Sequence, residues 1–130
     1  MEERAFAAAV AEQAGLGKEE AADLTRATLE ALGNQLSGGE VRDLATDLPE
    51  GLAASLPQRA GGARPVPLRE FIHQVRERTG LNPAEATRGT RAVLSTLGRA
   101  VDSPHVQHAL TQLPAEYRAF SAAGRRPEGQ

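Results

Sequence analysis

The sequence predicts an all-α fold: one domain of about eight helices, arranged as a tandem repeat of two four-helix units packed with pseudo-twofold symmetry. Two observations lead to this prediction. Alanine and leucine dominate the apolar residues, β-branched residues are sparse, and the only aromatic residues are Phe6, Phe71, Tyr117 and Phe120; this composition is typical of helices rather than sheets. In addition, the second half of the sequence repeats the residue pattern of the first half. Its 130 residues suffice for one domain with its own core.

The repeat keeps a single register, because adding 65 to a residue number moves from the first copy to the second without an insertion. Self-similarity of this length predicts two copies of one supersecondary unit, neither of which is expected to bury its apolar face alone. We assign the copies to residues 4–56 and 69–121, within a single domain covering residues 1–130. The matched pairs include Phe6 and Phe71, Val10 and Val75, Gly15 and Gly80, Thr25 and Thr90, and Leu48 and Leu113.

The first helix of each copy is predicted at residues 4–14 and 68–79, where apolar residues recur at helical spacing and a glycine follows as a left-handed C-terminal cap. The second helix is the longest and is predicted over residues 18–36. In the second copy its start is marked by Asn82 as the N-cap, followed by a proline in the first turn and a glutamate.

A leucine stripe gives the second helix its buried face, at Leu24, Leu29, Leu32 and Leu36. In the second copy Gly89 stands where Leu24 stands in the first. We expect this replacement to cost both packing and helix propensity.

A short third helix is predicted after Ser37, which with Glu40 fits a capping box. The second copy starts the same helix with the serine and proline at 103–104. The Leu-Pro pairs at 48–49 and 113–114 then break the chain, since proline disfavours a helical conformation for the residue before it. A short fourth helix is predicted after each pair.

Residues 57–67 join the copies and are rich in glycine and proline, so we predict an exposed linker there. The tail at 124–130 is expected to fray.

Charge is distributed unevenly along the chain. The first half, through Pro57, has 4 basic and 11 acidic residues, and the second half has 11 basic and 6 acidic residues, giving net charges of about −7 and +5. Such polarity favours head-to-tail association or attraction between the halves.

Composition excludes several classes of function. Without cysteine the chain has no disulfide, no thiolate catalysis and no cysteine-ligated metal site. The start of the chain lacks the basic residues of a signal peptide, and no apolar run approaches the roughly 18 residues that a membrane span needs. We therefore expect a soluble, cytoplasmic protein that does not use a membrane as its partner.

Three stretches carry a resemblance to a known family. They are T-R-A-x-L-x-x-L at 25–32, L-S-G-G-E-x-x-D-L-A-x-x-L-P at 36–49, and L-P-x-E-Y-R-x-F at 113–120. This pattern resembles a bacterial family known as domain of unknown function 2267, and the resemblance spans nearly the whole chain. It implies a small, cytoplasmic, all-helical protein with paired repeats. It supplies no activity, substrate or catalytic residue.

A metal site is one hypothesis for the third helices. His105 and His108 lie on one helical face and fall where Glu40 and Asp43 stand in the first copy. Two histidines and two carboxylates resemble the ligand sets of helical-bundle metal sites, provided that the third helices meet. The structural alternative is that Glu40 serves the capping box and that the histidines are exposed. We favour this alternative and predict no cofactor.

Arg26 and Arg91 are the basic residues that both copies of the long helix retain. They are candidates for contact with a partner or an anion. Alternatively, they form ion pairs with Glu12 and Glu77, which both copies also retain. We favour the ion pairs.

No motif in the sequence indicates a reaction. There is no recognisable nucleophile motif, and the basic second half lacks the interleaved aromatic residues that favour specific nucleic-acid binding. We therefore predict that the protein is not an enzyme but a protein–protein interaction or oligomerisation module, with an unknown protein partner or self-association. The alternative is a small-ligand or metal-binding protein that uses the groove between the two repeats.

Overall fold

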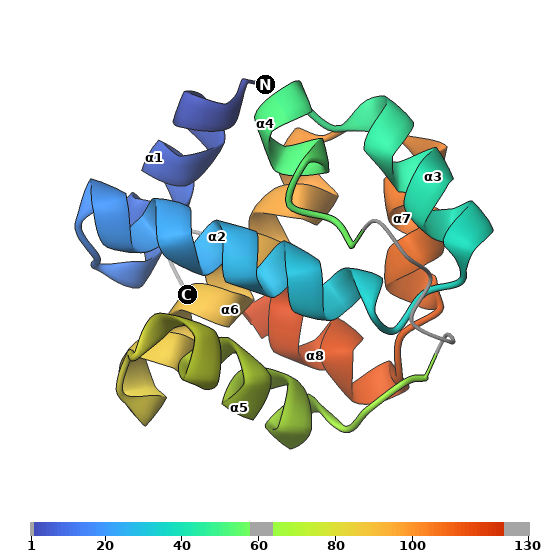
Figure 1. Ribbon diagram of the computed structural model, residues 1–130. Coiled ribbons are helices and arrows are strands. Elements are labelled where there is room, and N and C mark those ends of the chain that lie inside the picture. The colour runs from blue at the N-terminus through green and yellow to red at the C-terminus, as the bar shows by residue number, and fades with distance from the viewer. Residues whose placement is uncertain (1, 58–63, 124–130) are drawn as a thin grey trace.

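The computed structural model describes residues 2–57 and 64–123, and every regular element within these ranges is an α-helix. The all-α prediction is therefore confirmed. Four helices come from each repeat (Figure 1). They are α1 (Glu3–Ala14), α2 (Lys18–Gly33), α3 (Gly38–Asp47), α4 (Glu50–Ala53), α5 (Leu68–Thr79), α6 (Pro83–Ala100), α7 (Pro104–Thr111) and α8 (Ala115–Ala123).

Local signals in the sequence set most of the helix ends. Helices α1 and α5 stop at Gly15 and Gly80, whose φ angles of 69° and 78° lie in the left-handed region that glycine adopts without a steric penalty. Helix α3 begins after Ser37, whose Oγ accepts a hydrogen bond from the Glu40 N–H at 3.1 Å. Asn82 caps α6 in the same way.

Helix α2 ends at Gly33, three residues before the predicted end at Leu36. The N–H groups of Gln35 and Leu36 instead donate to carbonyls three residues back, at 3.0 and 3.1 Å. These tighter turns let the chain reach the extended conformation that Ser37 needs as the N-cap of α3. The cap of the next helix therefore decides where α2 stops.

The two repeats exchange packing partners. Helix α1 packs most extensively on α6 of the other repeat, and its counterpart α5 packs on α2 (Figure 1). Where α2 crosses α6, and where α3 meets α7, equivalent helices of the two repeats contact each other. Exchanging the two repeats turns the α1–α6 contact into the α5–α2 contact, which is consistent with the predicted pseudo-twofold packing.

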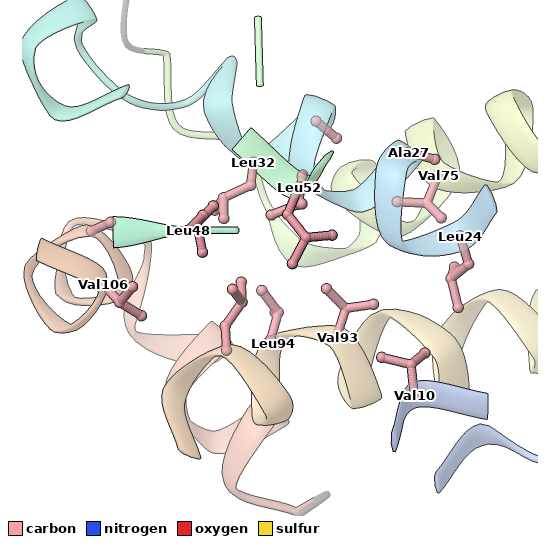
Figure 2. Close-up of a cluster of buried hydrophobic side chains, with 14 of the residues drawn as sticks. Val10, Leu24, Ala27, Leu32, Leu48, Leu52, Val75, Val93, Leu94 and Val106 are labelled. Atoms are coloured by element: carbon pink, nitrogen blue, oxygen red, sulfur yellow. The ribbon is translucent and has the colours of Figure 1, made fainter. Parts of the chain in front are cut away.

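One hydrophobic core joins both halves of the chain. Phe6 and Phe71 are both fully buried in it, and the centre of the Phe71 ring lies 5.3 Å from the centre of the Tyr117 ring. Because the apolar face of each half is covered by the other half, the two repeats form one core. Figure 2 shows side chains of this core from both halves, including Leu24, Leu32, Leu52, Val75, Val93 and Leu94.

Gly89 does not leave the packing defect that its sequence position predicts. A Cβ atom built at Gly89 would lie 2.1 Å from Cδ2 of Leu24, which is completely buried. Gly89 and Leu24 are equivalent positions of the two repeats and meet where α6 crosses α2. Since there is no room for two leucines at this crossing, glycine accommodates the leucine. The expected packing loss is therefore wrong, and only the cost in helix propensity remains.

The end of the predicted linker is held in place at Val66, which is half-buried. The Tyr117 hydroxyl donates to the Val66 carbonyl at 2.7 Å, and the Val66 N–H donates to Oε1 of Gln35 at 2.9 Å. Gln35 Nε2 donates in turn to the Tyr117 hydroxyl at 3.1 Å, which closes a ring of three hydrogen bonds. Of the four described residues at this end of the predicted linker, Arg64, Pro65 and Pro67 are exposed, and Val66 alone is half-buried. Residues 58–63 and the predicted tail at 124–130 lie outside the described residues.

Candidate functional site

The third helices of the two repeats, α3 and α7, pack against each other in opposite directions. Glu40, near the start of α3, faces His108 in the later part of α7, with 3.5 Å between Oε2 and Nε2. Asp47, the last residue of α3, faces His105 in the first turn of α7, with 2.8 Å between Oδ2 and Nδ1. The meeting of third helices that the metal hypothesis required therefore occurs.

The four candidate metal ligands do not form one cluster. Glu40 contacts His108, but His105 contacts Asp47, and Asp43 is exposed. Within the described ranges, no group of three or more histidine, aspartate or glutamate side chains is placed to hold one ion. The arrangement consists of two carboxylate–imidazole pairs at opposite ends of the α3–α7 contact.

Asp47 is the residue of this surface that sequence reasoning missed. The Ser103 hydroxyl, which caps α7, donates a hydrogen bond to Asp47, and His105 bonds to the same carboxylate oxygen. These hydrogen bonds, Ser103 first and His105 second, lower the pKa of Asp47 below its ordinary value. Asp47 lies seven residues, or two helical turns, after Glu40, and this spacing in the sequence places both carboxylates on the same face of α3. The repeat concealed it, because the counterpart of Asp47 is Gln112.

Arg26 and Arg91 have different environments although they are equivalent in the repeat. Nη2 of Arg26 lies 2.5 Å from Oδ1 of Asp23, and half of the Arg26 side chain is exposed. Nε of Arg91 donates to the Phe120 carbonyl at 3.2 Å, and the Arg91 guanidinium lies 4.6 Å from the centre of the Phe120 ring. Arg91 therefore holds α8 on α6 through a hydrogen bond and a cation–π contact.

The ion pairs favoured from the sequence do not form. Arg26 pairs with Asp23 rather than with Glu12, and Glu77 lies 3.4 Å from His73 rather than beside Arg91. Spacing along α2 explains the first difference, because Asp23 is three residues from Arg26 and therefore on the same helical face.

An open hollow of about 600 Å³ lies beside Arg26, between α2, α4 and α5. Two ion pairs occupy much of its rim: Arg26 with Asp23, and Arg78 with Glu30 at 3.0 Å. Its charged groups are thus already paired with each other. The hollow is lined by Asp23, Arg26, Ala27, Glu30, Gly51, Ala54, Ser55 and Arg78.

Two smaller cavities lie elsewhere, each between the third and fourth helices of one repeat. The first-repeat cavity, between α3 and α4, has a volume of about 350 Å³. The second-repeat cavity, between α6, α7 and α8, has a volume of about 270 Å³. The second-repeat cavity is lined by Leu94, Ser95, Gly98, Gln107, Leu110, Thr111, Arg118, Ser121 and Ala122.

The fold and these surfaces define a helical tandem-repeat protein whose repeats share one core and meet through carboxylate–imidazole pairs. Among the described helices, none has the length and apolar character needed to cross a bilayer. A family model described as "Uncharacterized conserved protein (DUF2267)" matches residues 3–120, so the chain belongs to this family. The resemblance seen in the sequence motifs is thereby confirmed. No curated protein matches the chain.

Proposed function

We propose that the protein is a non-catalytic interaction module that associates with a second copy of itself, the acidic first half of one molecule facing the basic second half of another. The sequence also predicts a cytoplasmic location. The observation that carries the proposal is the uneven charge, about −7 in the first half and +5 in the second. Opposite charges on one chain favour head-to-tail contact between copies.

The folded chain leaves much of this charge free for such a contact. Among the described residues, a single ion pair of permanently charged side chains, Arg78 with Glu30, joins the halves. Exposed acidic side chains of the first half include Glu12, Glu19 and Glu20, and exposed basic side chains of the second half include Arg69, Arg88 and Arg99.

Sedimentation velocity at several protein and salt concentrations tests the proposal. We expect association at low ionic strength that weakens as salt is added, because the screening length falls from about 10 Å at 0.1 M to about 3 Å at 1 M. A concentration-independent monomer at low salt would contradict self-association.

Charge-reversal variants sharpen the test. Replacing Glu19 and Glu20 with arginine should abolish self-association, and so should replacing Arg69 and Arg99 with glutamate. A mixture of the two variants should associate again, since each then carries the charges that the other lost. The matched control replaces Glu70 and Glu77 with arginine, which makes the same charge change of +4 within the basic half and should not weaken association. Equal weakening by this control would show that net charge alone is responsible.

The alternative function, binding of a small ligand or a metal between the repeats, is favoured by two features. They are the hollow beside Arg26 and, for the metal, two separate histidine–carboxylate pairs between α3 and α7, each of which supplies two possible ligands. Metal analysis of untagged protein tests the metal form. The metal hypothesis predicts that the purified protein contains stoichiometric zinc and that this zinc is lost when His105 and His108 are replaced with alanine. Absence of bound zinc and of a thermal shift on adding zinc would reject it.

A further inference from the structure

The second-repeat cavity contains a buried hydroxyl without a partner. Ser95 is 1% exposed, and its Oγ makes no hydrogen bond among the described residues. A helical serine commonly bonds to the carbonyl four residues back, and a buried polar group that bonds to nothing lowers stability. The repeat does not require a serine here, because the counterpart is Glu30, which is exposed and paired with Arg78. An unpartnered buried hydroxyl calls for an explanation, and at the wall of a cavity a bound molecule can supply the missing hydrogen bond.

Arg118 supplies the same cavity with a positive charge. It comes from α8, is exposed, and makes no side-chain ion pair or hydrogen bond among the described residues. Leu94 of α6 and Leu110 of α7 contribute aliphatic surface to the cavity. Its other polar side chains already donate hydrogen bonds to backbone carbonyls; they are Gln107, Thr111 and Ser121. The cavity thus combines a cation and a buried hydroxyl, neither with a side-chain partner among the described residues, with aliphatic surface, and a ligand site uses such a combination.

The cavity of the first repeat supports the importance of the cation. Five of its lining positions lie 65 residues before positions that line the second-repeat cavity. Each cavity has one arginine, but from opposite walls: Arg42 comes from the third helix and Arg118 from the fourth, and their counterparts are Gln107 and Ala53. The position of the arginine changes between the repeats, while the presence of one arginine does not.

We propose that the second-repeat cavity binds a small carboxylate whose short aliphatic chain carries one hydroxyl or carbonyl group. Arg118 binds the carboxylate, Leu94 and Leu110 contact the aliphatic chain, and Ser95 bonds to the additional polar group. A volume of about 270 Å³ lies just below the range of about 300–1,000 Å³ that is typical of small-molecule sites, which favours a small ligand. This site lies within one repeat, so it differs from the groove between repeats and uses none of the acidic residues proposed for self-association.

Protein-observed NMR of the labelled full chain tests this inference with three probes: butyrate, β-hydroxybutyrate and the uncharged butyramide. Spectra are recorded at a salt and protein concentration where sedimentation shows a monomer, so failure of self-association cannot be mistaken for failure of this site. β-Hydroxybutyrate should shift amide signals of α6, α7 and α8. Butyramide should bind about tenfold more weakly, because it lacks the charge that Arg118 recognises.

Two pairs of variants assign the contacts. Arg118→Gln should weaken both acids about tenfold, whereas Arg118→Lys should retain part of the affinity. Ser95→Ala should weaken β-hydroxybutyrate but not butyrate. Its matched control is Thr90→Val, which removes the other unpartnered buried hydroxyl of α6, outside the cavity, and should change neither affinity.

The inference is overturned by any of three results. The first is that neither acid shifts signals of these helices, and the second is that Arg118→Gln leaves the affinity for both acids unchanged. The third is that Ser95→Ala and Thr90→Val weaken β-hydroxybutyrate equally, which would indicate a general loss of packing in α6. Thermal unfolding of each variant confirms that it is folded before it is titrated.

Discussion

Tyr117 connects three segments that are distant in the sequence. Its hydroxyl is hydrogen bonded to Gln35 at the end of α2 and to the Val66 carbonyl, and its ring packs on Phe71. The residue is 2% exposed, and burial, which disfavours the charged phenolate, raises its pKa to about 12. The neutral hydroxyl donor is therefore part of the folded structure.

A spectroscopic titration should show this shift directly, because Tyr117 is the only tyrosine of the chain. We expect the ultraviolet absorbance of the phenolate to rise with a midpoint near pH 12 in the folded protein, and near the ordinary value of 10.0 in urea. Since the folded pKa is raised, this stabilisation is complete below pH 10 and is lost as the pH rises through 12. A folded-state midpoint near 10 would contradict the buried hydrogen-bonded geometry.

Asp47 should give the protein an acid-sensitive contact between its repeats. Its pKa is lowered by Ser103 and His105, so its contribution is present above the ordinary value of 3.8 and is lost as the pH falls through the lower, folded value. Asp47→Asn should therefore destabilise the protein at neutral pH and have a smaller effect in acid, measured by urea unfolding at each pH. The exposed Asp43→Asn is the control and should matter at neither pH. The prediction fails if Asp47→Asn costs the same free energy throughout.

At the scale of whole helices, the crossing of α2 and α6 is decided by a leucine opposite a glycine. The Cβ position of Gly89 overlaps Leu24, so the helices can approach at this point only while position 89 has no side chain. The sequence comparison pairs Gly89 with Leu24 as counterparts, but only their contact shows that the difference between them is complementary.

This complementarity predicts that the effect of Gly89→Ala on the free energy of unfolding changes sign when Leu24 is replaced with alanine. In the wild-type chain, Gly89→Ala gains about 1 kcal/mol in helix propensity but costs about 1–3 kcal/mol through overpacking, so it should be neutral to destabilising. Leu24→Ala alone should cost about 2–5 kcal/mol. In the Leu24→Ala background, Gly89→Ala should instead stabilise, because the overlap is gone. Urea unfolding of the four proteins measures this coupling.

Gly98→Ala is the matched control on the same helix. A Cβ there would lie 3.4 Å from Leu110, an ordinary contact, so the substitution should stabilise by up to about 1 kcal/mol whether position 24 is leucine or alanine. Gly89→Ala that stabilises the wild-type chain as much as Gly98→Ala does would disprove tight packing at the crossing.

At the scale of the whole molecule, the repeats depend on each other because each supplies the main packing partners of the other. Helix α1 lies on α6 and α2 lies on α5, and the buried face of each half is completed by the opposite half. Half of a chain of 130 residues would also bury a smaller share of its surface than the whole.

The two halves, residues 1–57 and 58–130, should therefore not fold when they are produced separately. Each alone should show little helical circular dichroism and no cooperative unfolding, while an equimolar mixture should recover both, because mixing restores the shared core. Cooperative unfolding of one half alone would show that its repeat is an independent domain.

The sequence by itself determined the all-α class, the repeat, the family, and most helix ends, because caps such as Gly15, Gly80 and Asn82 act within one turn of the chain. It also located the third helices as the surface where acidic residues and histidines gather. Only the tertiary structure decided which of these residues meet. Asp47 bonds to His105, Arg91 lies on Phe120, and Gly89 accommodates Leu24. Such contacts depend on which helices are neighbours and on the direction in which they cross. Periodicity along one helix carries no information about either, since it specifies the buried face but not the partner that covers it.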